Sequence, residues 1–165
     1  TDADGWLLSR PPATVLPTPI KGMNWGIRAT FKSQTERPPE LILRSSSKAN
    51  FNAYLETGGR MLTIQRYESE AENRYQTLIR SRLTRTLPLD KPYTIAFYAI
   101  GPHLIAQIDD EIITAAFDKP HDPGRVSIYG IQTSAFRDVE VLNLDLLPLE
   151  EAFRLARLPL PKPAP

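Results

Sequence analysis

The chain has 165 residues, of which 41% are apolar, and it carries a formal net charge of +1 at neutral pH. This length fits one domain with a hydrophobic core of its own. The near-neutral charge excludes the broad basic surface that recruits nucleic acid, so we expect no nucleic acid partner. Because the chain has no cysteine, disulfides, thiolate metal sites and a cysteine nucleophile are excluded within it. No apolar run approaches the roughly 18 residues of a membrane span, and we expect no membrane insertion by this chain.

The first strand patterns appear near the N-terminus. Residues 6–8 are expected to form a short edge strand, and the four prolines at positions 11, 12, 17 and 19 disfavour helix after it. From residue 24 onward apolar and polar residues alternate, with Trp25, Ile27, Ala29 and Phe31 on one face. A period of two with one apolar face is typical of a half-buried strand, so we expect Trp25 in the core.

The same alternation recurs along most of the chain. Further strands are expected at residues 41–43, 51–55, 62–64, 75–79, 93–100, 104–108, 112–117, 126–129 and 136–144. Turn-forming pairs such as Gly58-Gly59 and Gly101-Pro102 separate several of these segments. About ten to twelve short strands with no long helix between them predict a sandwich or a barrel.

Only the C-terminal region has a helical pattern. At residues 148–158 a proline stands where the first helical turn tolerates it, and Leu149, Phe153 and Ala156 share one stripe. We therefore expect a β-sandwich domain, a helix that packs on it or leaves it, and a proline-rich tail or linker, at residues 1–147, 148–158 and 159–165.

Five stretches of the sequence, taken in chain order, form a pattern that is typical of a known protein family. They are NWGIRATFK at 24–32, NFNAYLE at 50–56, and the later runs YTIAFYAIGPHLIAQIDDEIITAAFD, PGRVSIYG and FRDVEVLNLD. Over roughly residues 24–144 the chain resembles the concanavalin A-like lectin/glucanase superfamily, and more narrowly its LamG-like and 3-keto-disaccharide hydrolase-like bacterial domains. Asp110-Glu111 stand where those families more often have glycine. The resemblance implies an all-β, concanavalin-like jelly-roll sandwich of two antiparallel sheets with a short C-terminal helix.

The resemblance also suggests a function. Because the superfamily is rich in sugar binders, it implies a non-catalytic recognition module of a larger bacterial protein with a glycan as partner. The end of the chain also looks like domains appended to bacterial serine/threonine kinases, which implies a protein-interaction or sensory domain with a protein partner. The third hypothesis for its function is a glycoside hydrolase-like enzyme. An extracytoplasmic or cell-surface location is favoured, and the oligomeric state is open.

Carbohydrate binding needs aromatic surfaces for sugar rings and planar polar side chains for hydroxyl groups. Side chains of these kinds stand on the polar sides of the expected strands. The candidate ligand-binding residues are Arg28, Arg44, Asn52, Tyr54, Arg66 and Arg80, with Tyr67 and Arg82 as further members of the same set. We expect Arg28, Asn52 and Tyr54 to share one sheet face if the neighbouring strands are in suitable register.

One acidic pattern suggests catalysis. Glu68, Glu70 and Glu72 would share a strand face, and jelly-roll glucanases use a similar acidic triplet. Small residues stand between these acids, whereas a strand of a sandwich needs apolar residues there to pack inward. We therefore predict a solvated hairpin loop and assign no catalytic residue.

Two further polar segments suggest a metal. Asp109, Asp110 and Glu111 have oxygen ligands of the kind that calcium prefers, but a tight turn explains the same run without a metal. A second polar loop holds Asp118, His121 and Asp122, with the same two readings. We expect no cofactor, with calcium as the alternative. His103 beside Gly-Pro is read as a turn residue.

Overall fold

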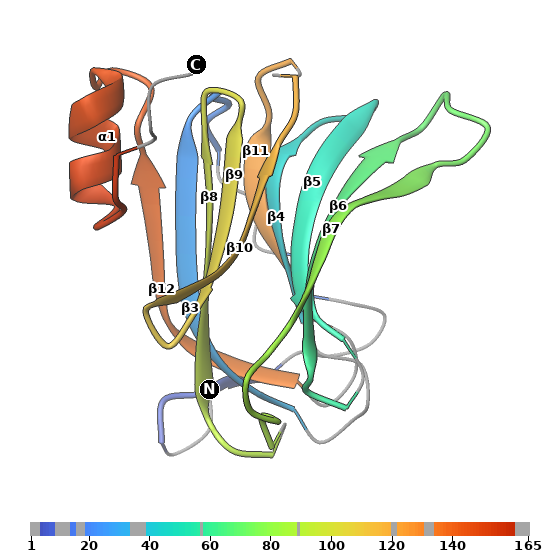
Figure 1. Cartoon of the computed structure of the whole chain (residues 1–165), viewed down its shortest axis with the longest axis vertical. Coiled ribbons are helices and arrows are strands. Elements are labelled where there is room, and N and C mark those ends of the chain that lie inside the picture. The colour runs from blue at the N-terminus through green and yellow to red at the C-terminus, as the bar shows by residue number, and fades with distance from the viewer. Residues whose placement is uncertain are drawn as a thin grey trace.

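In a computed structural model the strands form two six-stranded antiparallel sheets that pack face to face (Figure 1). The structure describes residues 4–8, 14–15, 19–33, 39–56, 58–88, 90–119, 122–130 and 134–160. The predicted two-sheet antiparallel sandwich is confirmed, and the strand number lies within the expected ten to twelve.

Sheet A contains the strands on the left of Figure 1. Its order across the sheet is β1 (Leu7–Leu8), β12 (Ser134–Asn143), β3 (Trp25–Ser33), β8 (Tyr93–Ile100), β9 (His103–Ile108) and β10 (Glu111–Phe117). Sheet B contains the strands on the right. Its order is β2 (Thr14–Val15), β11 (Arg125–Gly130), β4 (Glu40–Ser45), β5 (Ala49–Leu55), β6 (Met61–Glu68) and β7 (Tyr75–Arg82).

The core lies between the two sheets, where alternate residues of each strand point inward. Phe31 and Phe97 of sheet A meet Phe51 and Leu41 of sheet B in one cluster, and all four are fully buried. Trp25 belongs to the same cluster, as predicted from its place in the alternation. Each sheet therefore has an inner face, which is buried in this core, and an outer face, which is either covered by other elements or exposed.

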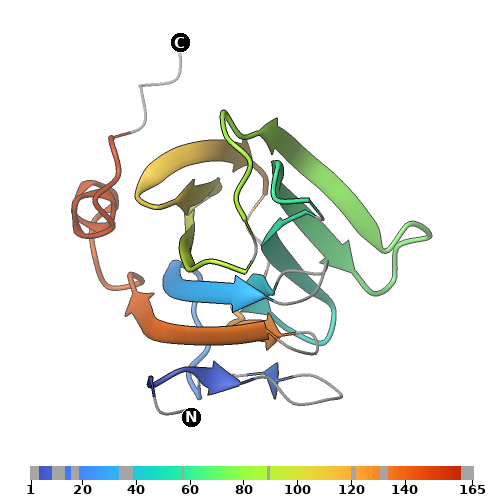
Figure 2. The same ribbon diagram turned by 90° about the horizontal axis from the view of Figure 1, so that it is seen from below.

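The helix α1 (Leu149–Leu155) covers part of the outer face of sheet A (Figure 2). Phe153 and Ala156 pack there with Tyr98 and Ile105 in a second apolar cluster. Leu149, which we expected in the same stripe, is instead 47% exposed, because the helix begins only at this residue, after Pro148 at the N-cap position. No helix within the described ranges is long and apolar enough to cross a membrane. In the described part of the chain, no helix covers the outer face of sheet B.

A set of polar contacts joins the loops at one end of the sandwich. Gly22 and Gly124 exchange two backbone hydrogen bonds of 3.0 Å. The guanidinium of Arg44, which is 1% exposed, donates to the carbonyl oxygens of Met23 and Gly101. Burial lowers the pKa of this guanidinium to about 10, so it remains charged at neutral pH.

Candidate functional site

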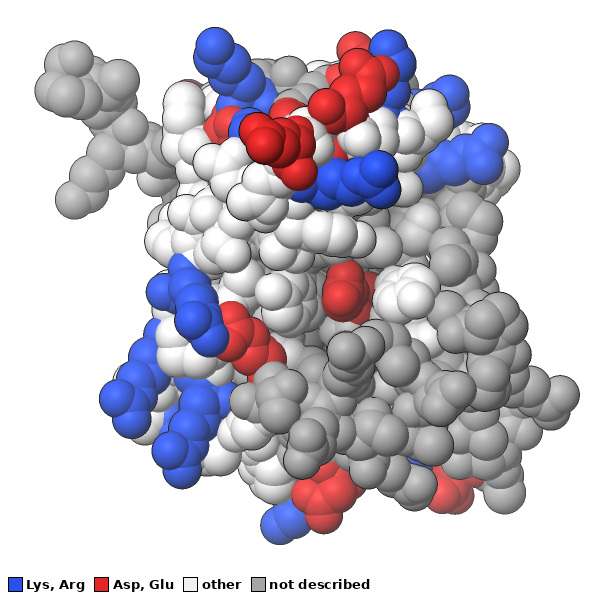
Figure 3. All heavy atoms as spheres, turned by 90° about the vertical axis from the view of Figure 1, so that its right-hand side faces the viewer, with Lys and Arg blue, Asp and Glu red and all other residues white. Residues whose placement is uncertain are grey.

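The outer face of sheet B is polar, and its strand register sets its side chains in rows. The first row crosses four strands, because Glu40 pairs with Tyr54, Tyr54 with Thr63, and Thr63 with Arg80. A second row is formed by Ile42, Asn52, Gln65 and Thr77, and a third by Asn50, Tyr67 and Tyr75. We call these rows the sheet B face, and Figure 3 views the molecule from the side on which sheet B lies.

In the first row an acid neutralises an arginine. Arg80 donates through Nε to Glu56 Oε1 at 2.6 Å and through a second guanidinium nitrogen to the other oxygen of Glu56. The hydroxyl of Thr63 also donates to Glu56. The hydrogen bond from Arg80 lowers the pKa of the Glu56 carboxyl, and Thr63 acts in the same direction against the effect of burial. Arg80 is therefore held in place and its charge is balanced.

This pair makes a pH-dependent contribution to stability. Because the pKa of Glu56 is lowered by folding, its stabilising effect is present above its ordinary pKa of 4.5 and is lost as the pH falls through the lowered value. We expect the unfolding free energies of wild type and Glu56→Gln to differ by a constant amount from about pH 7 to about pH 5 and to converge in more acidic solution. Urea unfolding at several pH values measures this difference, and parallel pH curves for the two proteins would contradict it.

The tyrosine of the first row remains a neutral phenol. Burial raises the pKa of the Tyr54 hydroxyl, and the nearby carboxylates of Glu56 and Glu40 raise it further. A phenol beside carboxylates offers one ring surface and one hydroxyl that can donate or accept. Such a side chain is suited to a ligand that carries both C–H and O–H groups.

The second row contains a buried amide with unused hydrogen-bonding capacity. Asn52 is 6% exposed, and its Nδ2 donates to Glu40 Oε2 at 2.8 Å. Among the residues that the structure describes, Asn52 Oδ1 has no hydrogen-bond partner, and the same is true of Asn50 Oδ1. Buried amide oxygens are normally satisfied by protein, water or ligand. Two such oxygens, on adjacent outward positions of β5, are therefore enclosed acceptors without a donor among the described residues.

An aromatic pair closes the third row. The rings of Tyr67 and Tyr75 have centroids 5.0 Å apart, and Tyr75 is 54% exposed. Exposed aromatic rings offer apolar surfaces on which a sugar ring can stack. In Figure 3 the charged side chains gather at the upper end and the lower left of the face, while its centre is mostly uncharged.

Three of the six predicted ligand-binding residues, namely Asn52, Tyr54 and Arg80, lie together on the sheet B face. Arg28 lies on β3 in sheet A, where it forms an ion pair with Asp110. The expectation that Arg28 shares a face with Asn52 and Tyr54 is wrong, because β3 and β5 belong to different sheets.

The other two predicted arginines lie away from the sheet B face. Arg44 is buried at the end of the sandwich, because its guanidinium binds the two loop carbonyls described above. Arg66 pairs with the inward-facing Phe51, so it points to the side between the sheets, where it forms an ion pair with Asp118 at 2.9 Å. Both guanidinium groups are used within the protein.

Sequence reasoning missed the partners of the site. Glu40, Glu56, Thr63 and Gln65 have no distinguishing pattern in the sequence. The strand register brings them beside Asn52 and Tyr54, and that register is set by contacts between strands. The one available signal was the outward phase of residues 50, 52 and 54 in NFNAYLE.

The structure confirms the two turn predictions. Glu68 ends β6, and Glu70 and Glu72 lie in the hairpin loop before β7. Asp109 and Asp110 form the turn between β9 and β10 with φ values of 50° and 69°. No cluster of three acidic or histidine side chains able to hold a metal occurs among the described residues. His121 lies outside them.

The fold defined by these sheets is a concanavalin-like jelly roll, as predicted, and solved structures share it. The carbohydrate-binding module CBM66 from Bacillus subtilis superposes with a TM-score of 0.68 at 13% identity, covering 84% of this chain and 91% of that one. Sheep galectin-11 superposes with a TM-score of 0.56 at 9% identity, covering 81% of this chain and 100% of that one. A prokaryotic β-1,3-1,4-glucanase (lichenase) from a mouse hindgut metagenome gives 0.52 at 14% identity, covering 74% and 66%. No family model and no curated protein sequence matches the chain.

Proposed function

We propose that this domain is a non-catalytic recognition module of a larger protein and binds carbohydrate through the sheet B face. The observation that carries the proposal is the buried Asn52 amide, whose oxygen is unpaired within the described protein while Glu40 holds its nitrogen. This oxygen is enclosed, so a sugar hydroxyl would complete its hydrogen bonding once the side chains that cover it move aside. Tyr54 beside it supplies both a ring surface and a hydroxyl.

The charges of the face favour a neutral glycan. Arg80 is balanced by Glu56, and Glu40 adds a further carboxylate in the same row. Among the described residues of this row no cation is left uncompensated, so an acidic polysaccharide would gain no ion pair there. Neutral sugars offer hydroxyl donors, which carboxylate and amide oxygens accept.

The similar solved structures also favour carbohydrate binding. The Bacillus subtilis protein is a carbohydrate-binding module by name, and it matches most of this chain. Its sequence identity to this chain is too low to carry residues across, so the proposed site is based on this chain's own side chains.

Removing the amide or the phenol tests this proposal. We expect Asn52→Ala and Tyr54→Ala each to weaken binding to a neutral polysaccharide about tenfold, because each loses roughly one hydrogen bond to the ligand or one stacking surface. Affinity gel electrophoresis of wild type against plant, algal and bacterial polysaccharides identifies the ligand, and calorimetry with its oligosaccharide measures the loss.

Asn73→Ala is the matched control, since Asn73 is exposed in the β6–β7 hairpin loop. This variant should bind as wild type does. Failure of the wild-type domain to bind any neutral polysaccharide, or unchanged affinity in both site variants, would refute the proposal. A preference for acidic over neutral polysaccharides would refute its charge argument.

A further inference from the structure

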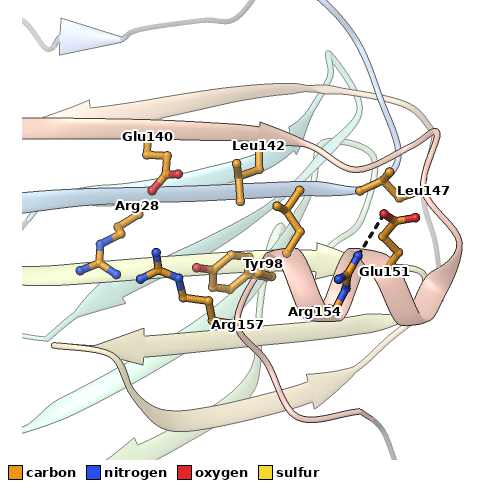
Figure 4. Close-up of a pocket in the computed structure, with 10 residues that line it drawn as sticks. Arg28, Tyr98, Glu140, Leu142, Leu147, Glu151, Arg154 and Arg157 are labelled. Atoms are coloured by element: carbon orange, nitrogen blue, oxygen red, sulfur yellow. Dashed lines mark hydrogen bonds and ion pairs between the residues drawn. The ribbon is translucent and has the colours of Figure 1, made fainter.

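A pocket of about 470 Å³ lies on the other side of the molecule, between α1 and the outer face of sheet A (Figure 4). Its walls come from β3, β8, β12 and α1 with residues on either side of the helix. This volume is in the range of small-molecule sites, which is about 300–1,000 Å³. The pocket shares no residue with the sheet B face.

One part of the pocket is apolar. Leu142, Leu147 and Leu155 line it together with the ring of Tyr98. Tyr98 pairs with Gly26 across β8 and β3, and a Cβ atom on Gly26 would lie 2.7 Å from Tyr98 Cδ1. The missing side chain of Gly26 thus lets the Tyr98 ring lie close over β3, where it forms part of the pocket wall.

The other part of the pocket is charged. In Figure 4 the side chains of Arg28, Arg157 and Glu140 gather at the end toward which the Tyr98 hydroxyl points. Burial raises the pKa of that hydroxyl, Arg28 and Arg157 oppose the rise, and Glu140 adds to it, so all three charges act on the same point. At the opposite end Arg154 pairs with Glu151 at 3.3 Å.

Two of these charged groups are unused. Arg28 is held by Asp110. Within the described ranges, the Arg157 guanidinium and the Glu140 carboxylate make no side-chain hydrogen bond or ion pair. A cation and an anion that line one pocket without a hydrogen bond or ion pair in the described ranges are available to a ligand that has both an acceptor and a donor.

Arg157 stands at a backbone position that favours glycine, so the helix end itself gives no reason for an arginine there. The helix ends in a Schellman motif, in which Leu158 N donates to Phe153 O at 2.9 Å and Arg157 N to Arg154 O at 3.0 Å. Arg157 occupies the left-handed position of this motif with φ of 55°, where glycine is strongly preferred. Arg154 already places a cation in the last helical turn, so the helix dipole does not explain a strained arginine here.

We propose that this pocket binds a small carboxylate with an apolar body, with Arg157 pairing the carboxylate, Glu140 accepting an N–H or O–H of the same ligand, and the leucines covering the apolar part. Of the two cations at the charged end, Arg28 is already held by Asp110, which leaves Arg157 for an anionic group of the ligand. A singly charged carboxylate therefore fits better than a phosphate, whose second charge would have no counterpart.

The test uses two probes that differ only in the carboxylate. N-acetyl-leucine has a carboxylate, an N–H donor and an aliphatic body, while N-acetyl-leucinamide lacks the negative charge. In titrations followed by ¹H–¹⁵N NMR, we expect saturable shifts at the amides of Gly26, Tyr98 and Arg157 with the acid, and at least tenfold weaker binding of the amide. Inorganic phosphate is expected to bind at least tenfold more weakly than the acid.

Arg157→Gly separates the ligand role from a structural one. Because glycine suits the left-handed position, this variant should keep or raise its Tm, by roughly 1–4 °C, while its affinity for N-acetyl-leucine falls at least tenfold. Arg74→Gln, an exposed arginine of the β6–β7 hairpin, is the control and should bind as wild type does. Glycan binding should be unchanged in Arg157→Gly, so the two sites are tested independently.

Three results would overturn the carboxylate site. They are the absence of saturable shifts with N-acetyl-leucine, equal affinity for its amide or for phosphate, and undiminished affinity in Arg157→Gly. A fall in Tm with unchanged affinity would assign Arg157 to the helix end alone.

Discussion

Gly124→Ala is expected to destabilise the fold by about 3 kcal/mol or more, because the new methyl group has no space. A Cβ atom at this position would lie 2.1 Å from the carbonyl carbon and 2.3 Å from the carbonyl oxygen of Arg44. Both contacts are with backbone, so relief requires β4 and the loop before β11 to move apart. That movement would also strain the two bonds to Gly22 and the 3.1 Å bond from Trp25 Nε1 to Gly124 O.

Urea unfolding followed by tryptophan fluorescence measures this loss, since Trp6 and Trp25 are both buried. In thermal unfolding the expected fall in Tm is about 6–12 °C for a chain of this size. Gly58→Ala is the comparison, because nothing lies within 4 Å of a Cβ atom there and only its φ of +85° opposes a side chain. It should cost about 1 kcal/mol. Equal losses in the two variants would contradict the close approach at Gly124.

Asp145→Ala is expected to cost about 3 kcal/mol. The Asp145 carboxylate accepts the backbone N–H of Met23 with both oxygens at 3.0 Å and that of Asn24 at 2.6 Å. It also makes the larger favourable charge interaction with the buried Arg44 guanidinium, ahead of Asp118, and so supports the charged form of Arg44. The substitution therefore leaves two backbone donors unpaired and removes a counter-charge, and charge-assisted hydrogen bonds are worth about 1.5–3 kcal/mol each.

Chemical unfolding of Asp145→Ala, Asp145→Asn and Asp90→Ala checks this loss. Asn retains one acceptor oxygen, so we expect Asp145→Asn to lose roughly half as much as Asp145→Ala. Asp90 is exposed, and its replacement should change stability by less than about 0.5 kcal/mol. A stability loss in Asp145→Ala no larger than in Asp90→Ala would show that the carboxylate does not hold the two loops.

The sandwich could be predicted because strand alternation is a local property of the sequence. Trp25 and Phe31 stand in phase with one another, and the structure buries both. The predicted burial of the helical stripe was also correct for Phe153 and Ala156. Leu149, in the same stripe, is exposed because the helix begins there. Where an element begins depends on capping and tertiary contacts, which periodicity does not show.

The candidate site was only partly predictable, because the phase of a strand does not say which sheet it joins. Asn52 and Tyr54 share a face on β5 from their spacing alone, yet Arg28 has the same outward phase on a strand of the other sheet. Arg44 stood in a polar position of its strand, but its φ of 52° and its bonds to loop carbonyls turn it into the interior. Sheet assignment and loop contacts are both long-range properties.

The most direct test of the central claim is an NMR titration of the assigned domain with an oligosaccharide of the neutral polysaccharide that it retains in affinity gels. We expect saturable shifts centred on the amides and side chains of Asn52, Tyr54 and Gln65, with no comparable shifts near α1. Shifts confined to sheet A or to the loops at the ends of the sandwich would contradict a sugar site on the sheet B face, and so would retention of no neutral polysaccharide at all.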